Sequence, residues 1–434
     1  MQTKMKNRLF LGYKWVLIFV FLALGNNLIA QFTLNGEFRP RAEYRHGLKT
    51  LVAKNDDAAF HISQRTRLNA GFRVENLKFG LSIQDVRLWG EAPQQINNSN
   101  RLMLHQGWAE YGFSPEFSVK LGRMELVYDD ARIFGNVNWS QHAKSHDLAL
   151  FKYEKNFKLH AGVAFNQQYD QLLTTNYDMK SNYKTMQILW YNKKFNQLGM
   201  SILFLNNGME NVKTIQNTDI YKTVFSQTYG THLTFDLKNI ALFGSAYYSG
   251  GKDASERKLS AWYAALGLDH KLSNAVGIGA GWELLSGTSQ KELTDNPDYT
   301  NRSFSPLYGT SHKFNGLMDY FYAGNHLNTV GLSDLYLNLS YQYKKINWVL
   351  TSHFFSAAND VLKIGQTSEL MDKGLGTEID LTLEYELNDF ATVNAGYSQM
   401  FGTETLQTIK QTGDYKATNN WLWLMVTFKP VFIK

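Results

Sequence analysis

Arginine recurs at alternate positions in two stretches near the N-terminus, giving Arg39, Arg41, Arg65 and Arg67. A guanidinium group binds a carboxylate through two parallel hydrogen bonds, so arginines that share one face of a strand would hold acidic ligands. Glu37 and Glu43 follow the same spacing and are close enough in sequence to pair with the arginines instead. Two interpretations stay open: a wall that binds anions, or a ladder of ion pairs that braces the structure.

Residues that would support catalysis or metal binding are sparse. His142 and His146 lie four apart, but at a loop-to-strand boundary, where this spacing does not bring two side chains onto one face. Asp129 and Asp130 could bind a cation or exchange protons, although paired acids in a loop are usually solvated or paired with nearby arginines. The chain has no cysteine and no GxSxG, HExxH or glycine-rich phosphate motif. We expect no enzyme, no metal site and no cofactor, although spacing alone leaves open a hydrolase with a serine and histidine pair.

Alternation of apolar and polar side chains indicates β-strands. From Phe32 to Arg45 the two faces differ in polarity for 14 residues, whereas strands in soluble proteins average about 5 or 6. A strand that crosses a bilayer needs about 9 to 11 residues, with lipid-facing and lumen-facing side chains alternating. Eighteen such runs are predicted, at residues 32–45, 60–75, 77–89, 103–113, 117–124, 147–153, 157–166, 184–192, 196–206, 223–236, 239–250, 260–270, 275–286, 332–343, 346–356, 376–386, 390–401 and 420–429. A change of parity near Gln84 predicts a bulge in the third run.

The gaps between the predicted strands alternate in length. Every second gap has one to four residues, and the others have from nine, at 251–259, to forty-five, at 287–331. Short turns at one end and long loops at the other are typical of outer-membrane barrels, with periplasmic turns and extracellular loops. Closure into a barrel also removes the sheet edges, whose polar groups a bilayer cannot hydrogen-bond. We therefore predict an all-β, antiparallel, up-and-down transmembrane barrel of about 18 strands, forming a single domain over residues 31–434.

Strand parity predicts which side chains line the lumen. The first two strands turn their alternate arginines inward, and Arg87 joins them past the predicted bulge. Lys78, Lys120 and Lys158 extend the basic wall. The late strands place acids inward, namely Glu283, Asp334, Glu378, Asp380 and Glu384. A basic wall opposite an acidic wall predicts a transverse electric field across an aqueous pore.

The N-terminus has the residue pattern of a sorting signal. Basic residues come first, at Lys4, Lys6, Arg8 and Lys14, and are followed by the apolar run 15–25 and by the small residue Ala30. This order is typical of a cleaved signal peptide over residues 1–30, and an 11-residue run is shorter than the roughly 20 residues that a membrane anchor needs. Cleavage would leave 40 basic and 38 acidic side chains, so the formal net charge falls from +6 to +2. The basic balance therefore does not indicate a nucleic-acid partner.

Two stretches resemble the alginate export porin family. Residues 121–135, continuing through Trp139 to Asp147, look like its hallmark segment, and residues 304–321 are similar to its second signature. The stretch 36–43 also matches the family's usual first strand. The resemblance implies an outer-membrane barrel with a pore that passes an anionic polysaccharide. It implies a constriction formed by Arg39, Arg41, Arg65, Arg67, Arg87, Arg123 and Arg132, and organised by the acids Glu37, Glu43, Asp129 and Asp130.

The leading hypothesis is a channel for anionic oligo- or polysaccharides in the outer membrane of a Gram-negative bacterium. The expected partners are membrane lipid, an anionic carbohydrate or small anionic solute, and the outer-membrane assembly machinery, and we expect a monomer. A general diffusion porin for small nutrients is the first alternative. A surface adhesin or enzyme on a plugged barrel, with a role for the 287–331 loop, is the second.

Overall fold

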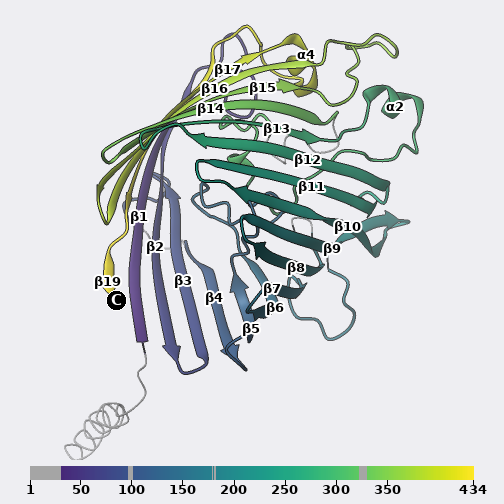
Figure 1. Ribbon diagram of the computed structural model, residues 1–434. Coiled ribbons are helices and arrows are strands. Elements are labelled where there is room, and N and C mark those ends of the chain that lie inside the picture. The colour runs from purple at the N-terminus through teal and green to yellow at the C-terminus, as the bar shows by residue number, and fades with distance from the viewer. Residues whose placement is uncertain (1–30, 96–100, 178, 180–181, 322–329) are drawn as a thin grey trace, which may run out of the picture.

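The computed structural model describes residues 31–95, 101–177, 179, 182–321 and 330–434, which form a closed antiparallel β-barrel (Figure 1). From β1 to β18 each strand pairs with the next one along the chain, and β18 closes the barrel by pairing with β1, as does the short β19 beyond it. The strands are β1 (Gln31–His46), β2 (Ala59–Val74), β3 (Leu77–Leu88), β4 (Leu102–Gly112), β5 (Phe117–Met124), β6 (His146–Glu154), β7 (Lys158–Phe165), β8 (Thr185–Phe195), β9 (Leu198–Ile215), β10 (Thr218–Asp236), β11 (Ile240–Lys252), β12 (Lys258–Lys271), β13 (Val276–Leu285), β14 (Leu332–Tyr343), β15 (Ile346–Ser356), β16 (Gly374–Asn388), β17 (Ala391–Gly402), β18 (Asn419–Phe428) and β19 (Val431–Ile433). The predicted signal peptide, residues 1–30, lies outside the described residues.

The helices in the described part of the chain are short and belong to the long loops. They are α2 (Gln290–Asp295), the 3-10 turn η1 (Ser311–Lys313) and α4 (Glu404–Lys410). In the described ranges, no helix is long and apolar enough to cross a membrane.

The predicted antiparallel barrel is confirmed, but two details of the strand prediction are wrong. Residues 207–222, predicted as a loop, extend β9 and β10 to a two-residue turn at Gln216 and Asn217. Both faces of this extension carry polar side chains, which removes the alternation expected of a strand in lipid. The register between β2 and β3 runs through Gln84 without a shift, and the bulge lies instead in β4, next to His105.

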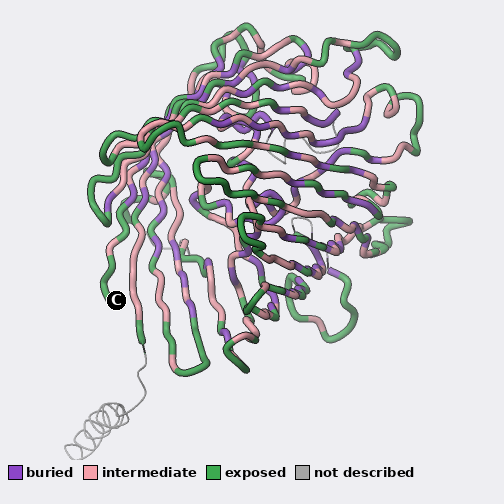
Figure 2. The backbone as a smooth tube through the Cα atoms, viewed as in Figure 1, coloured by how far each residue is buried: buried purple, intermediate pink, exposed green. Residues whose placement is uncertain are grey.

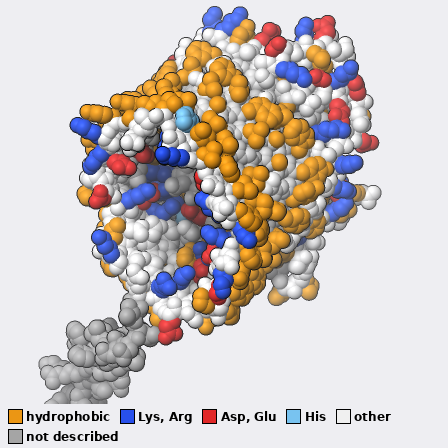
Figure 3. Space-filling view, in the orientation of Figure 1, with side chains coloured by type: hydrophobic (Ala, Val, Ile, Leu, Met, Phe, Trp, Pro, Cys, Tyr) orange, Lys and Arg blue, Asp and Glu red, His pale blue; other side chains and the backbone are white. Residues whose placement is uncertain are grey.

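The outer face of the wall is apolar. On β14 the side chains of Leu335, Leu337 and Leu339 point outward and are 46–50% exposed. Figure 3 shows that hydrophobic side chains cover much of the visible outer wall, whereas charged side chains gather at its two ends and inside a hollow at the short-turn end. An exposed apolar band of this kind is what a lipid environment requires of a barrel.

The alternation of faces can be tested on one strand. Replacing Leu337 with arginine on the outer face should destabilise the barrel in vesicles by about 2–4 kcal/mol, because a charge near the bilayer midplane loses its hydration. Arginine in place of Ser340, which faces the lumen opposite Gly277, should change it far less. Urea titration of both variants in lipid vesicles gives the comparison, and equal losses would contradict the assigned faces.

Two segments of the long loops fold into the barrel and meet there. One is residues 125–145, between β5 and β6, and the other is residues 303–321, between β13 and β14. The backbone N–H of Gly135 donates to Tyr308 O (3.1 Å), and that of Thr310 donates to Ala131 O (2.9 Å). A Cβ atom on Gly309 would lie 2.1 Å from a backbone oxygen of the 125–145 loop, so the crossing requires glycine at this position.

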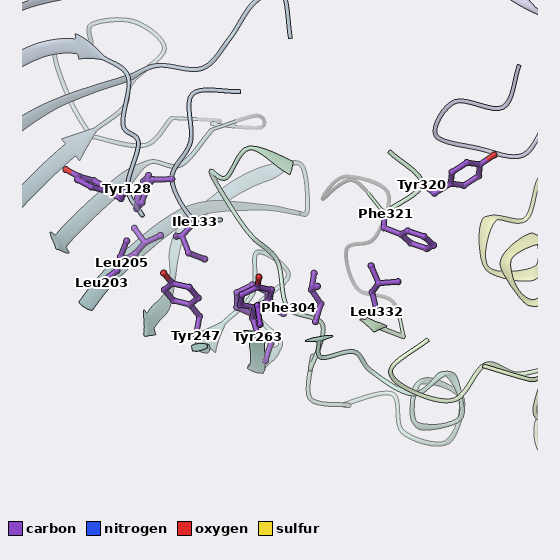
Figure 4. Close-up of a cluster of buried hydrophobic side chains, with 14 of the residues drawn as sticks. Tyr128, Ile133, Leu203, Leu205, Tyr247, Tyr263, Phe304, Tyr320, Phe321 and Leu332 are labelled. Atoms are coloured by element: carbon purple, nitrogen blue, oxygen red, sulfur yellow. The ribbon is translucent and has the colours of Figure 1, made fainter. Parts of the chain in front are cut away.

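The two inward segments give the barrel an apolar core inside its lumen. Leu203 and Leu205, on the inner face of β9, are at most 1% exposed and belong to one cluster with Tyr128 and Ile133 of the 125–145 loop (Figure 4). Buried residues accordingly concentrate in the half of the barrel nearer the long loops (Figure 2). The lumen is therefore packed at this level, and the polar, water-filled interior that an 18-stranded wall predicts is restricted to the remaining part.

Candidate functional site

The four alternate arginines of β1 and β2 face the lumen, as their spacing predicts, and each is at most 8% exposed. They are buried because the 125–145 loop lies against them. Arg39 donates from Nη1 to Asn138 O (2.9 Å) and from Nη2 to Ser140 O (3.1 Å), and Arg41 donates from Nη1 to Trp139 O (2.8 Å). The basic wall thus holds backbone carbonyl oxygens of the loop.

The two glutamates of β1 brace the same wall. Arg65 donates from Nε to Glu37 Oε1 (2.7 Å), and Arg41 donates from Nε to Glu43 Oε1 (2.8 Å). Arg67 instead donates from Nε to Gln84 Oε1 (3.0 Å) on the neighbouring strand β3. The ion-pair ladder therefore accounts for part of the arginine pattern, and the loop satisfies the remaining guanidinium donors.

Arg132 is the point where the two inward segments and the wall meet. It is 2% exposed, and its Nη2 donates to Glu283 Oε2 on β13 (2.9 Å) and to Asn315 Oδ1 (3.0 Å). Its guanidinium carbon lies 4.8 Å from the ring centroid of Tyr263 and 4.4 Å from that of Phe314. Charge pairing and stacking of this kind are what a buried arginine needs to offset its lost hydration.

Arg87 and Arg123 do not join this group, and their assignment to the pore is wrong. Because β3 has no bulge, Arg87 lies opposite the outward residue Gln64 and pairs with Asp85 (2.5 Å). Arg123 is also on the outward parity, between two inward residues of β5, and pairs with Asp147 at 2.6 Å. Both are therefore ion pairs of the outer face near the long-loop end.

The paired acids of the 125–145 loop serve its packing. Asp129 accepts hydrogen bonds from Trp190 Nε1 (3.0 Å) and, weakly, from the Tyr247 hydroxyl (3.5 Å). Burial raises the pKa of Asp129 above its usual value, although hydrogen bonds from neighbours oppose the shift. Asp130 Oδ1 accepts the backbone N–H of Arg132 (3.0 Å). Neither carboxylate pairs with an arginine side chain among the residues that the structure describes, so the expected ion pairs are not formed there.

The loop also contains charged groups that burial perturbs. Burial lowers the pKa of Lys144 to about 8, and its Nζ lies 3.4 Å from Gly309 O in the other inward segment. Burial alone would raise the pKa of Glu125, but hydrogen bonds from His105 and Asn136 outweigh it and hold that pKa below its usual value. Across the described ranges, no group of three or more His, Asp or Glu side chains is placed to hold a metal ion.

The acidic wall binds the other inward segment. The backbone N–H of Met318 donates to Glu378 Oε1 (2.7 Å), and that of Leu317 donates to Asp380 Oδ2 (3.2 Å). Asn315 Nδ2 donates to Asp334 Oδ2 (3.1 Å). These acids point inward as their parity predicts. The arginines therefore hold carbonyl oxygens of one segment, and the acids hold N–H groups of the other, so the charge asymmetry of the barrel matches the backbone polarity of the loops.

Sequence reasoning missed two amides that complete these contacts. Gln141 accepts from Arg39 Nε (3.1 Å) and donates to Ser63 Oγ (3.1 Å). Asn315 links Arg132 to the acids of β13 and β14. Both lie in loops without periodicity. Their position within the two stretches that resemble the family's motifs was the only sequence signal that they have a role in the site.

Comparison with known proteins agrees with this architecture. A family model described as alginate export matches residues 30–419. Among solved structures, the chain is similar to OpdO of Pseudomonas aeruginosa, with a TM-score of 0.59 and 11% identity over 93% of this chain and 98% of that chain. OccK2 (OpdF) of the same organism gives a TM-score of 0.58 and 11% identity over 93% and 98% of the two chains.

OccK9 (OpdG), also from Pseudomonas aeruginosa, gives a TM-score of 0.57 and 12% identity over 92% of this chain and 98% of that chain. At these identities the likeness to solved structures shows the fold alone. No curated protein matches the chain. Because the family model covers nearly the whole barrel, the chain belongs to the alginate export family and is a porin-like barrel of the outer membrane.

Proposed function

We propose that the barrel is a channel, not an enzyme, that passes anionic oligo- or polysaccharides along its basic wall. The observation that carries the proposal is that Arg39, Arg41 and Arg65 already hold oxygen atoms, those of the 138–141 backbone and side chains. A carboxylate oxygen forms a stronger, charge-assisted hydrogen bond with a guanidinium group than a neutral carbonyl does. A uronate-type carboxylate would therefore compete for these donors.

The basic wall continues toward the short-turn end, below the inward loops. Lys78 and Lys152 lie 3.7 and 3.2 Å from the same Glu110 oxygen, and Lys120 is directly opposite Glu110 in the β4–β5 register. Lys120 Nζ also lies 3.6 Å from the ring centroid of Trp108. Lys152 also lies 3.7 Å from Glu154, so three cations face two carboxylates. They leave a positive surface in the open part of the lumen, where an anion entering from the short-turn end would first bind.

Replacing Lys78, Lys120 and Lys152 with glutamine should shift the reversal potential in a potassium chloride gradient toward cation selectivity, because the local charge changes from positive to negative. A matched control removes three exposed lysines of the long-loop end, Lys213, Lys222 and Lys363, and so changes the net charge equally. We expect anion preference in the wild type and in the control, measured in planar bilayers.

The alternatives give different results in the same experiment. A general diffusion porin would show weak selectivity that the lysine substitutions barely alter, and a surface adhesin or enzyme on a plugged barrel would show no conductance. A soluble oligouronate should block the chloride current, and the block should be weaker in the lysine variant. This result would distinguish a channel for acidic carbohydrates from one that passes small anions only. Cation preference in the wild type would overturn the proposal. We also propose that the channel is a monomer, which its signal peptide directs across the inner membrane and the outer-membrane assembly machinery inserts.

A further inference from the structure

A cavity of about 550 Å³ lies inside the barrel on the side away from the arginines of β1 and β2. Its walls are the inner faces of β10 to β16, and residues 313–317 of the inward segment also line it. The volume falls within the range of about 300–1,000 Å³ that small-molecule sites occupy. The anion route proposed above does not use this space.

One row of the cavity wall is an aromatic floor. Phe243, Gly267, Gly281 and Tyr336 are successive partners across β11, β12, β13 and β14. A Cβ atom on Gly267 would lie 2.0 Å from the Phe243 ring, and one on Gly281 would lie 2.3 Å from the Tyr336 ring. The two rings therefore lean toward each other over a pair of glycines, and both line the cavity. A flat aromatic face is negatively polarised and attracts a cation.

The next row toward the short-turn end carries a carboxylate. Asp269 is the partner of Gly279, and a Cβ on this glycine would lie 2.3 Å from Asp269 Oδ1 and 2.5 Å from Asn338 Nδ2. Asp269 is exposed to the lumen and forms no ion pair with any residue that the structure describes. The two rings, Asp269 and Asn338 occupy the space above the glycines, so they lie close against the wall, and the cavity that they line is open above them.

The other acids of the cavity already have basic partners, an arginine or a histidine. Glu283 pairs with Arg132 (2.9 Å), and Asp334 pairs with His353 (3.0 Å). Lys313 also lines the cavity, but its Nζ donates to the backbone oxygen of Asp130 (2.8 Å). The hydroxyl of Tyr263, which is 1% exposed and lines the same cavity, has no hydrogen-bond partner within the described ranges.

We propose that this cavity binds an organic ammonium ion, with the charged nitrogen beside Asp269 and over the rings of Phe243 and Tyr336. A compact inorganic cation would leave the apolar floor uncovered, and a neutral solute would leave Asp269 without a counter-charge. The barrel then carries two solute sites of opposite preference. The basic wall on β1 to β7 binds anions, and this site on β11 to β14 binds cations.

Choline chloride is the probe, and 3,3-dimethyl-1-butanol, which has the same shape without the charge, is the matched ligand. In titration calorimetry of the purified barrel, choline should bind in the millimolar range and the alcohol at least about tenfold more weakly. Asp269→Asn should weaken choline binding about tenfold. Gly281→Ala, which pushes the Tyr336 ring off the floor, should weaken it as well.

Asp236→Asn is the control variant. Asp236 occupies the same row of the inner wall as Asp269, two strands away, but is paired with Lys194 (3.3 Å), so its loss should leave choline binding unchanged. Heat-dependent migration on gels verifies that each variant forms a barrel. The proposal is overturned if wild-type protein does not bind choline, if the alcohol binds equally well, or if Asp269→Asn and Asp236→Asn behave alike.

Discussion

Replacing Arg132 with methionine will lower the free energy of unfolding by about 3–5 kcal/mol, because the substitution leaves Glu283 as a buried carboxylate without its partner. Glu283 is 5% exposed, and the Asn315 amide, at 3.2 Å, is a weaker substitute for the guanidinium group. The loss should also loosen the junction between the inward segments, since Arg132 stacks on Phe314 of the second segment.

Arg123→Met provides the comparison on the outer face. Arg123 is also paired with one carboxylate, but both groups of that pair are more than a third exposed, and exposed pairs contribute about 0–1 kcal/mol. Urea unfolding in lipid vesicles, followed by tryptophan fluorescence, measures both variants. The double variant Arg132→Met with Glu283→Gln should regain part of the stability, because it removes the uncompensated charge. Similar losses for Arg132→Met and Arg123→Met would contradict the structural role of Arg132.

The wall of the barrel could be predicted because a bilayer imposes a strict period of two. Leu337 must face lipid and Asp334 the lumen, whatever contacts they make, so parity alone places both. The rule fails where lipid is absent: the β9–β10 extension carries polar residues on both faces and looks like a loop in the sequence. It also fails in β3, where an apparent change of parity near Gln84 predicts a bulge that the β2–β3 register does not have, and Arg87 is misplaced as a result.

The contents of the lumen could not be predicted in the same way. The inward segments are held by hydrogen bonds between side chains of the wall and backbone groups of the loop, such as Arg41 to Trp139 O, and backbone groups carry no sequence signal. Leu203 and Leu205 are the one sequence signal of a packed lumen, since leucine on the inner face of a strand is unfavourable in contact with water. The family resemblance singled out the two segments that fold into the lumen. It implied that the arginines line an open constriction, whereas in the structure they anchor a loop.

The anchored 125–145 loop leads to the second large effect, on conductance. Replacing residues 131–143 with a short glycine–serine linker should raise the single-channel conductance severalfold, because these residues fill the lumen between the basic wall and the inner face of β9. An 18-stranded wall is too wide for its own side chains to close, so the loops set the size of the opening. The strand ladders are untouched, and the barrel should still fold, although Leu203 and Leu205 would then contact water.

Planar-bilayer recording tests this prediction against a deletion of similar kind outside the lumen. Removing residues 213–220 shortens the exposed tip of the β9–β10 hairpin by about two rows and should leave the conductance unchanged. A barrel that lacks residues 131–143, folds, and conducts no better than the wild type would show that the second inward segment, residues 303–321, limits the opening by itself. A large conductance with lost anion preference would mean that the guanidinium groups select anions only while the loop holds them in their ordered positions.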